Sequence, residues 1–235
     1  MVSSYLTRED VMADATVVVT ADAMARDTRK VTSVTATKRD TSATVMKRDM
    51  SATAMRKVMS TADTRKVTSA TAIRTKVKTS VVILNWNTTG YLEKFVPGIL
   101  KSLEGMDAEL VVADNASTDG SMQMMESKFP NVKRIILDKN YGFTGGYNKA
   151  LAQLDSEYFV LLNSDIEVPE GWLQPLVETL DNNPEVGACA PKLHSWYERN
   201  KFEYAGAAGG YIDCFGFPLC RGRIMQMLET DEGQY

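Results

Sequence analysis

The chain of 235 residues is long enough for one ordinary domain with a sizeable core, and 44% hydrophobic with 24% charged residues is a globular composition. No apolar run reaches the roughly 18–20 residues of a membrane span, and the start does not resemble a secretion signal. The three cysteines form no CxxC pair, so a disulfide framework or a zinc site is not expected. The net charge of −3 gives no reason to expect a nucleic-acid partner.

The average composition hides two different halves. Residues 1–80 contain no Gly, no Pro and one aromatic residue, Tyr5, and they carry 15 Lys and Arg against 8 Asp and Glu. Residues 81–235 carry the other 12 Lys and Arg and 22 Asp and Glu, together with every Gly, Pro, Trp and Cys. This shift indicates a basic extension followed by an acidic folded domain.

The basic extension is repetitive, with serines at a strict period of nine at positions 33, 42, 51, 60 and 69. That period matches neither a coiled coil nor the longer repeats of helical solenoids. Because the repeat has no clean apolar face, we expect residues 1–78 to be a low-complexity extension that is disordered or weakly structured. It is an incidental extension, a tether or a basic arm, although its lack of interleaved aromatics does not favour nucleic-acid binding.

From residue 76 onward the pattern alternates between strand and helix. Apolar, β-rich runs predict four strands within KTSVVILNWN (78–87), AELVVAD (108–114), NVKRIILDKN (131–140) and EYFVLLNSD (157–165). Helical spacing predicts helices at 90–105, from Ser117 or Thr118 to Phe129, at 142–154 and at 169–183. Pro97 lies inside the first helix and can kink or divide it.

Fully apolar strands that alternate with helices indicate a Rossmann-like α/β fold, in which a mostly parallel sheet is covered by helices on both faces. Ligands of such sheets bind beyond the carboxyl ends of the strands. Four of these ends are chemically distinctive: NWN (85–87), DNASTDGS (114–121), DKNYGFTGG (138–146) and NSD (163–165). Their convergence on one edge points to a ligand site more strongly than any single motif does.

Two acidic residues stand directly after apolar strands. Asp114 can accept hydrogen bonds from a nucleobase or a ribose hydroxyl, or it can simply cap the next turn. Asp165 can bind a hard divalent cation that bridges the phosphates of a nucleotide. One protein carboxylate is sufficient in principle, because phosphate oxygens and water can complete the coordination of Mg or Mn.

The third strand end is rich in glycine. Gly142, Gly145 and Gly146 lie at the start of a predicted helix, where they let the backbone approach an anionic ligand. A tight turn without a ligand is the alternative explanation. The loop is neither GxGxxG nor a Walker loop, so by itself it does not identify the ligand.

Together, four segments resemble the family 2 glycosyltransferases, and most closely a bacterial branch of rhamnosyl- and related transferases of surface polysaccharides. The segments are VVILNWN, LVVADNASTDGS, NYGFTGGYNKAL and YFVLLNSDIEVPEGWL, and the resemblance covers about residues 79–195. It implies the type A nucleotide-sugar-binding fold, inverting chemistry, a UDP- or dTDP-linked donor and a divalent metal, Mg or Mn. It further implies a glycan or lipid-linked acceptor and a cytoplasmic protein that can associate peripherally with the inner face of the membrane.

The resemblance also assigns roles to individual positions. The residues implied to bind the nucleotide sugar are Asn85, Trp86, Asn87, Asp114, Asn140, Gly142, Gly145, Gly146, Asn163 and Ser164. Asp114 would contact the base. Asn163, Ser164 and Asp165 occupy the DxD site of the family, in which Asp165 supplies the metal ligand. Replacement of the first acid by Asn is frequent in this branch.

The general base of the family is an acid in the acceptor half, past the DxD site. None of the later acids has the usual sequence context; these are Glu203, Asp213, Glu229, Asp231 and Glu232. The catalytic base is therefore unknown, and we expect it after residue 235. His194 stands beside two aromatic residues, and we expect it to have a structural role.

Residues 79–235 are thus expected to be the C-terminally truncated nucleotide-sugar-binding domain of a glycosyltransferase. The alternative is a catalytically incomplete fragment that binds the donor without transferring the sugar. A nucleotidyltransferase of similar fold is a third possibility. It requires a Gly-rich loop with a basic residue after the first strand, and NWNTTGYLEK lacks one.

Overall fold

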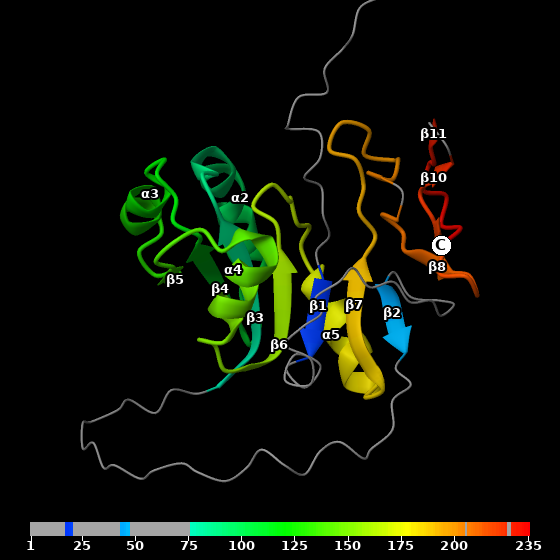
Figure 1. Ribbon diagram of the computed structural model, residues 1–235, viewed down its shortest axis with the longest axis horizontal. Coiled ribbons are helices and arrows are strands. Elements are labelled where there is room, and N and C mark those ends of the chain that lie inside the picture. Colours follow the sequence, from blue (N-terminus) through cyan, green and yellow to red (C-terminus); the bar gives the residue numbers. More distant parts are fainter. Residues whose placement is uncertain (1–16, 21–42, 48–75, 205, 225–226) are drawn as a thin grey trace, which may run out of the picture.

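The structure is a computed structural model that describes residues 17–20, 43–47, 76–204, 206–224 and 227–235 (Figure 1). Its centre is a seven-stranded sheet in the order β2-β7-β1-β6-β3-β4-β5. Four neighbouring strands run parallel, namely β3 (Val77–Asn85), β4 (Ala108–Asp114), β5 (Lys133–Ile136) and β6 (Ser156–Leu162). This parallel block confirms the predicted α/β fold.

The parallel strands are apolar on both faces. In β3, Val81 and Ile83 belong to one buried cluster and Val82 belongs to a second cluster. The same alternation holds in β6, where Val160 and Phe159 lie in different clusters. Because successive side chains of a strand point to opposite faces, continuous apolar runs require cover on both sides of the sheet.

Helices supply that cover. The first cluster contains buried residues of α2 (Thr89–Ser102), α3 (Ser121–Lys128) and α5 (Leu173–Asn182). The second contains those of α4 (Gly142–Leu151), which crosses the opposite face of the sheet (Figure 1). Pro97 does not divide α2, which continues past it to Ser102.

Three antiparallel pairings extend the sheet beyond β6. β7 (Val186–Pro191) is separated from β6 by β1 (Val17–Thr20), which pairs with both, and β2 (Ala43–Lys47) pairs with the other side of β7. We expected residues 1–78 to be disordered or weakly structured, but Val17–Thr20 and Ala43–Lys47 form the strands β1 and β2. The run VVVT in β1 is rich in β-branched residues, which favour strands. All other residues before 76 lie outside the described part of the chain.

The residues after β7 form small antiparallel elements. β8 (Gly210–Ile212) pairs with β9 (Pro218–Cys220), and β10 (Arg223–Ile224) pairs with β11 (Met227–Leu228). A separate buried cluster of Phe202, Ala207 and Ala208 holds this part together. Of the helices that the structure describes, none has the length and apolar character needed to cross a membrane.

Candidate functional site

The predicted site residues lie at the carboxyl edge of the parallel block. Asn85 ends β3 and stands in register with Asp114, which ends β4, and Asp114 stands in register with Ile136 at the end of β5. On the other side of β3, β6 ends at Leu162, one residue before Asn163. Because the chain turns back across β3 between β5 and β6, this edge contains the topological switch point at which open α/β sheets bind ligands.

Asn85 holds the first two loops together. Its side chain is fully buried, and Nδ2 donates to Asp114 Oδ1 at 2.8 Å and to Ser117 Oγ at 2.9 Å. The same nitrogen lies 2.8 Å from Ser121 Oγ, while Oδ1 accepts a hydrogen bond from Thr88 Oγ1 at 2.6 Å. A buried amide with this many partners fixes the relative positions of the loops that contribute them.

Asp114 is also part of this support. It is 3% exposed, and its Oδ2 accepts a hydrogen bond from the backbone N of Ser117 at 3.1 Å, in addition to the bond from Asn85. Both carboxylate oxygens are therefore engaged within the protein. A carboxylate oxygen can accept more than one hydrogen bond, so contact with a nucleobase stays a prediction that requires a remaining lone pair.

Asn87, in the loop after β3, forms further hydrogen bonds with the loop after β4. Asn87 and Ala116 have left-handed backbone conformations, with φ of 56° and 63°. The Asn87 Oδ1 accepts a hydrogen bond from Thr118 N at 2.7 Å, and its own N donates to Ser117 Oγ at 3.0 Å. Ser117 and Thr118, which were expected to cap the next helix, instead join the two loops, and α3 begins later, at Ser121.

Asp119 also lies at the carboxyl edge of the sheet, although the sequence did not single it out as a site residue. Its Oδ2 accepts hydrogen bonds from Thr89 N at 2.9 Å and Thr89 Oγ1 at 2.6 Å, and its Oδ1 accepts one from Ser121 N at 3.0 Å. Burial opposes ionisation, but these hydrogen bonds outweigh it and lower the pKa of Asp119 to about 2. The signal available in the sequence was an acid two residues before a helix, a position that suits N-terminal capping.

The second and third loops meet at Asn115. This residue is 3% exposed, and its Nδ2 donates to Asn140 Oδ1 and to the carbonyl oxygen of Gly142, both at 3.0 Å. Its Oδ1 accepts a hydrogen bond from Tyr141 N at 2.9 Å. Gly142 has a φ of 69°, which favours glycine. The structure therefore brings the predicted residues Asn140 and Gly142 to the same edge as Asp114.

The two later glycines have a packing role. A Cβ atom on Gly146 would lie 2.9 Å from both methyl groups of Leu84 and 3.1 Å from Asn115 Nδ2, while one on Gly145 would lie 3.1 Å from Tyr141 Cβ. Gly146 is buried at the contact between α4 and β3. The absence of a side chain there permits close approach of helix and strand, and a donor contact by either glycine stays a prediction.

Trp86 differs from its buried neighbour Asn85, because 53% of the tryptophan is exposed. An exposed indole at the carboxyl edge of a sheet offers a flat apolar surface on which a nucleobase can stack. Asn85 is thus buried beneath the edge, whereas the indole of Trp86 is exposed at it. The role of Trp86 in the nucleotide pocket stays a prediction.

The fourth loop follows β6, where the hydroxyl group of Tyr147 in α4 donates to the carbonyl oxygen of Leu162 at 3.1 Å and anchors the strand end. Asn163, Ser164 and Asp165 come next and are partly buried. Burial raises the pKa of Asp165, and the negative charge of Glu203 raises it further.

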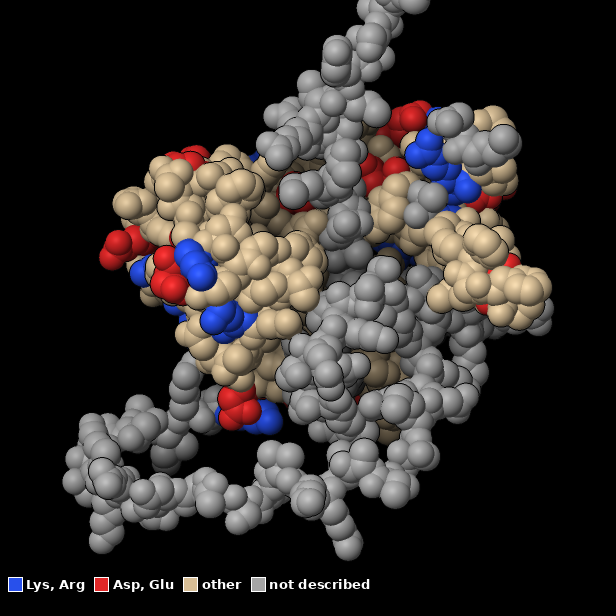
Figure 2. Space-filling model, in the orientation of Figure 1, with Lys and Arg blue, Asp and Glu red and all other residues tan. Residues whose placement is uncertain are grey.

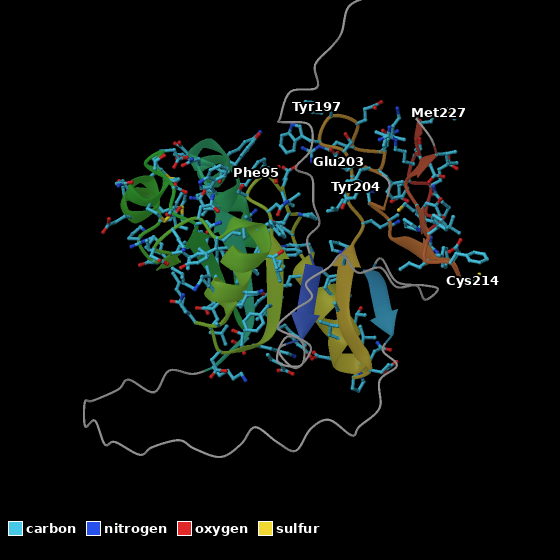
Figure 3. The ribbon with its side chains drawn as sticks, viewed as in Figure 1. Phe95, Tyr197, Glu203, Tyr204, Cys214 and Met227 are labelled. Atoms are coloured by element: carbon cyan, nitrogen blue, oxygen red, sulfur yellow. The ribbon has the colours of Figure 1, made fainter. Side chains whose placement is uncertain are left out.

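Glu203 comes from the segment after β7. The residue lies beyond the carboxyl end of the sheet (Figure 3), and in Figure 2, which has the same orientation, acidic atoms are visible at several separate places in the upper half of the view. Its Oε2 is buried and has no hydrogen-bond partner among the described residues. A buried carboxylate oxygen without a hydrogen-bond partner is uncommon in a folded protein. Asp165, in the fourth loop, offers the kind of carboxylate oxygen that a hard divalent cation prefers.

The other acids considered as candidate bases have local partners or are exposed. Asp213 accepts hydrogen bonds from two backbone amides of its own hairpin, and Glu229 accepts from a backbone amide and from the hydroxyl group of the last tyrosine. Asp231 binds a lysine and a histidine, and Glu232 is exposed. Among the five acids, Glu203 is thus the one with a buried oxygen that lacks a partner in the described chain.

His194 occupies a structural position. Its Nε2 lies 2.8 Å from Asp231 Oδ2, and its ring centroid lies 5.7 Å from that of Phe202. Lys192 Nζ binds the same carboxylate at 2.9 Å. Together these contacts tie the end of the chain to the segment that follows β7.

The comparisons with known proteins identify relatives of the acidic half. The "N-acetylglucosaminyl-diphospho-decaprenol L-rhamnosyltransferase" of Mycobacterium tuberculosis is 25% identical over 124 residues, which cover 48% of this chain and 40% of the relative. The "Dolichol-phosphate mannosyltransferase" of Pyrococcus furiosus is 28% identical over 113 residues, which cover 47% and 32%. The matched regions thus span less than half the length of these relatives.

One similar solved structure is that of S. aureus TarS 1-349 in complex with UDP-GlcNAc. It is 28% identical, with a TM-score of 0.40, and the match covers 46% of this chain and 32% of that chain. The family model described as glycosyl transferase family 2 matches residues 80–224. That match spans more than half of the chain and includes all four loops described above, and the chain therefore belongs to glycosyl transferase family 2.

Proposed function

We propose that this protein binds a UDP- or dTDP-linked sugar at the carboxyl edge of the parallel sheet and transfers the sugar, with inversion, to a glycan or lipid-linked acceptor. The observation that carries the proposal is the hydrogen-bonded assembly of the first three loops around Asn85 and Asn115. Such a network positions an edge of the sheet for a ligand before the ligand binds, which lowers the conformational cost of binding.

The proposed nucleotide lies across the first three loops. Trp86 would stack on the base, while Asn87 and the free lone pairs of Asp114 would meet the base or the ribose. The backbone from Asn140 to Gly146 would flank the donor, at the start of α4, where backbone N–H groups favour anionic ligands. The buried network under these groups would keep them in register.

The proposed sugar-diphosphate end of the donor lies near the fourth loop, with Asn163 and Ser164 as polar neighbours. Asp165 would hold a divalent cation, Mg or Mn, through its carboxylate. A cation in this position would neutralise the charge that develops on the departing diphosphate. An acceptor hydroxyl group would attack the anomeric carbon from the opposite side, which is the reason for inversion, and the base that takes its proton is not assigned.

The acceptor is proposed from the relatives. One is named for diphospho-decaprenol and the other for dolichol phosphate. These names support a lipid-linked acceptor, as in the rhamnosyltransferase-like branch. Work at the cytoplasmic face of a membrane in the synthesis of surface polysaccharide is a further part of the proposal. The donor sugar itself is not assigned.

The proposal is tested by nucleotide release. The protein is incubated with UDP-GlcNAc, UDP-glucose and dTDP-rhamnose in Mn²⁺ or EDTA, with and without undecaprenyl phosphate, and released nucleoside diphosphate is measured. Mn²⁺-dependent release from at least one donor, lost in Asp165→Asn, is the expected result. Donor binding without release under every condition would support a binding protein instead, and neither binding nor release would contradict the proposal.

A further inference from the structure

The segment after β7 carries a closed loop at residues 195–201. Ser195 N donates to the carbonyl oxygen of Lys201 at 2.9 Å, and this bond joins the two ends of the loop. Ser195 itself is buried, whereas the next two residues, Trp196 and Tyr197, are 38% and 92% exposed. Two large aromatic side chains are therefore presented to solvent by a loop whose ends are fixed.

Contacts place this loop beyond the carboxyl edge of the sheet. The ring of Trp196 meets the ring of Phe95 in α2 edge to face, with centroids 5.5 Å apart. Phe95 lies on the side of the molecule to which the parallel strands point (Figure 3). Arg199 forms an ion pair with Glu167, which stands two residues after Asp165 in the loop that follows β6. The closed loop thus contacts both α2 and the loop of the proposed metal ligand.

Two cations lie against the indole of Trp196. Lys94 Nζ lies 4.1 Å from the ring centroid, and Arg199 Cζ lies 4.4 Å from it. Lys94 Nζ is also 4.9 Å from the centroid of the Phe95 ring. Attraction between a cation and an aromatic ring holds the two side chains near one another. Because the ring has no net charge, these contacts position two positive charges without neutralising them.

The charge of Lys94 is not balanced by a carboxylate of the described chain. Lys94 takes part in none of the ion pairs among the described residues, whereas Lys101 in the same helix pairs with Glu170 at 2.5 Å. Arg199 has Glu167 as a partner, but a guanidinium carries five N–H donors, of which one carboxylate needs at most two. Two cations with one carboxylate leave an excess of positive charge and free donors at this place.

We propose that Lys94 and Arg199, held against Trp196, bind the phosphate group of a lipid-linked acceptor. The proposal rests on the proposed function, which supplies such an acceptor and leaves open how its head group is recognised. Phosphate oxygens accept charge-assisted hydrogen bonds from lysine and arginine. The phosphates of the donor are proposed to lie on the cation at Asp165, so the two basic side chains serve a second phosphate group.

The aromatic side chains beside the two cations favour a lipid phosphate over a free phosphate ion. Tyr197 is almost fully exposed next to Trp196. In α2, Tyr91 is 47% exposed and stacks on Phe95, with centroids 6.4 Å apart. Exposed aromatic rings offer apolar area with a polar end, which suits an isoprenoid chain that begins at a phosphate. A free phosphate ion would use the cations alone.

The test measures binding of geranyl diphosphate by isothermal titration calorimetry, in EDTA so that no cation at Asp165 takes part. Inorganic pyrophosphate and geraniol are titrated separately, as the head group without the chain and the chain without the head group. The variants are Lys94→Gln and Arg199→Gln. Lys101→Gln, an exposed lysine of the same helix with its own carboxylate partner, is the matched control.

We expect the wild type to bind geranyl diphosphate more tightly than pyrophosphate, and not to bind geraniol measurably. Lys94→Gln and Arg199→Gln should each weaken binding of geranyl diphosphate at least about tenfold, because each removes a charge-assisted hydrogen bond. Lys101→Gln should bind as the wild type does. Lys94→Arg, which keeps the positive charge against the indole, should retain most of the affinity.

Two further readouts separate this role from a structural one. Lys94 is exposed on the helix surface, so Lys94→Gln should unfold thermally close to the wild type. In the nucleotide-release assay, the same variant should raise the KM for undecaprenyl phosphate about tenfold and leave the KM for the donor unchanged. A structural defect would disturb both KM values.

The two proposals fail in different ways. Equal binding of geranyl diphosphate by the wild type and Lys94→Gln overturns the role of Lys94, and absence of binding by the wild type overturns the site. Pyrophosphate binding as tight as that of geranyl diphosphate would indicate a site for a free anion and would overturn the assignment to the acceptor. These titrations contain neither donor nor metal, so the nucleotide site stands in each case. Geranyl diphosphate binding without any nucleotide release contradicts the proposed function and leaves the anion site itself standing.

Discussion

Among single residues, Asp119 makes the clearest connection between two elements of the site edge. Its carboxylate accepts hydrogen bonds from Thr89 at the start of α2 and from Ser121 at the start of α3. The pKa of Asp119 is about 2 in the folded protein, against an ordinary value of 3.8. A depressed pKa means that the folded state favours the ionised form, so the stabilisation is complete above pH 3.8 and is lost as the pH falls through about 2.

We therefore predict a pH-dependent effect of Asp119→Asn. At pH 6 the variant should have a lower free energy of unfolding than the wild type, and the difference should shrink between about pH 4 and pH 2, as the wild-type carboxylate becomes protonated. Urea unfolding at a series of pH values measures this difference. Asp155→Asn, at a side chain that is 85% exposed, is the control. A difference for Asp119→Asn that stays constant down to pH 2 would contradict the prediction.

Single residues could be predicted from the sequence where their place on a strand was enough. Asn85, Asp114 and Asp165 stand at the ends of apolar runs, and the structure places all three at the carboxyl edge. The importance of Asn115 depends on Asn140 and Gly142, partners that are distant in sequence. No local pattern contains that information, and only the folded chain shows which polar atoms meet.

Among the elements, the contact between α4 and β3 depends on one glycine. We predict that Gly146→Ala lowers the free energy of unfolding by about 1–3 kcal/mol, because the new methyl group would overlap Leu84 and move the helix. Nucleotide affinity should fall too, since Asn115 contacts the same place. Chemical denaturation and titration with nucleotide measure the two effects.

The matched control is Gly98→Ala in α2. A Cβ atom there would meet nothing within 4 Å, and alanine is favoured over glycine inside a helix by roughly 0.5–1 kcal/mol. The control should therefore be neutral or stabilising. Equal destabilisation by both substitutions would show that close approach to Leu84 is not the reason for glycine at position 146.

The long elements were predictable because their apolar periodicity repeats several times. β3, β4 and β6, with α2 and α5, lie within the predicted ranges, give or take a residue at their ends. The start of α3 was not predictable in the same way, because Ser117 and Thr118 found stronger partners in the first loop than in the helix. The short strands after β7 lack any apolar period and depend on backbone pairing between turns.

For the whole molecule, the parallel block alone positions the candidate site. β3, β4, β5 and β6 bring four separate loops to one edge, and the helices on both faces bury the strands that carry them. β1 lies between β6 and β7, and β2 lies on the outer side of β7, so both strands are separated from the first three loops by β6. That residues 1–78 form an extension separate from the nucleotide-sugar-binding domain stays our proposal.

The central claim is that this edge is a metal-dependent nucleotide site in which Asp165 holds the cation. Isothermal titration calorimetry with UDP, dTDP and GDP, each with and without Mn²⁺, tests it in the wild type, in Asp165→Ala and in the control Asp155→Ala. We predict that at least one nucleotide binds the wild type and the control more tightly with Mn²⁺, and that Asp165→Ala loses this enhancement. Absence of binding by every nucleotide, or unchanged Mn²⁺-dependent binding in Asp165→Ala, would contradict the claim.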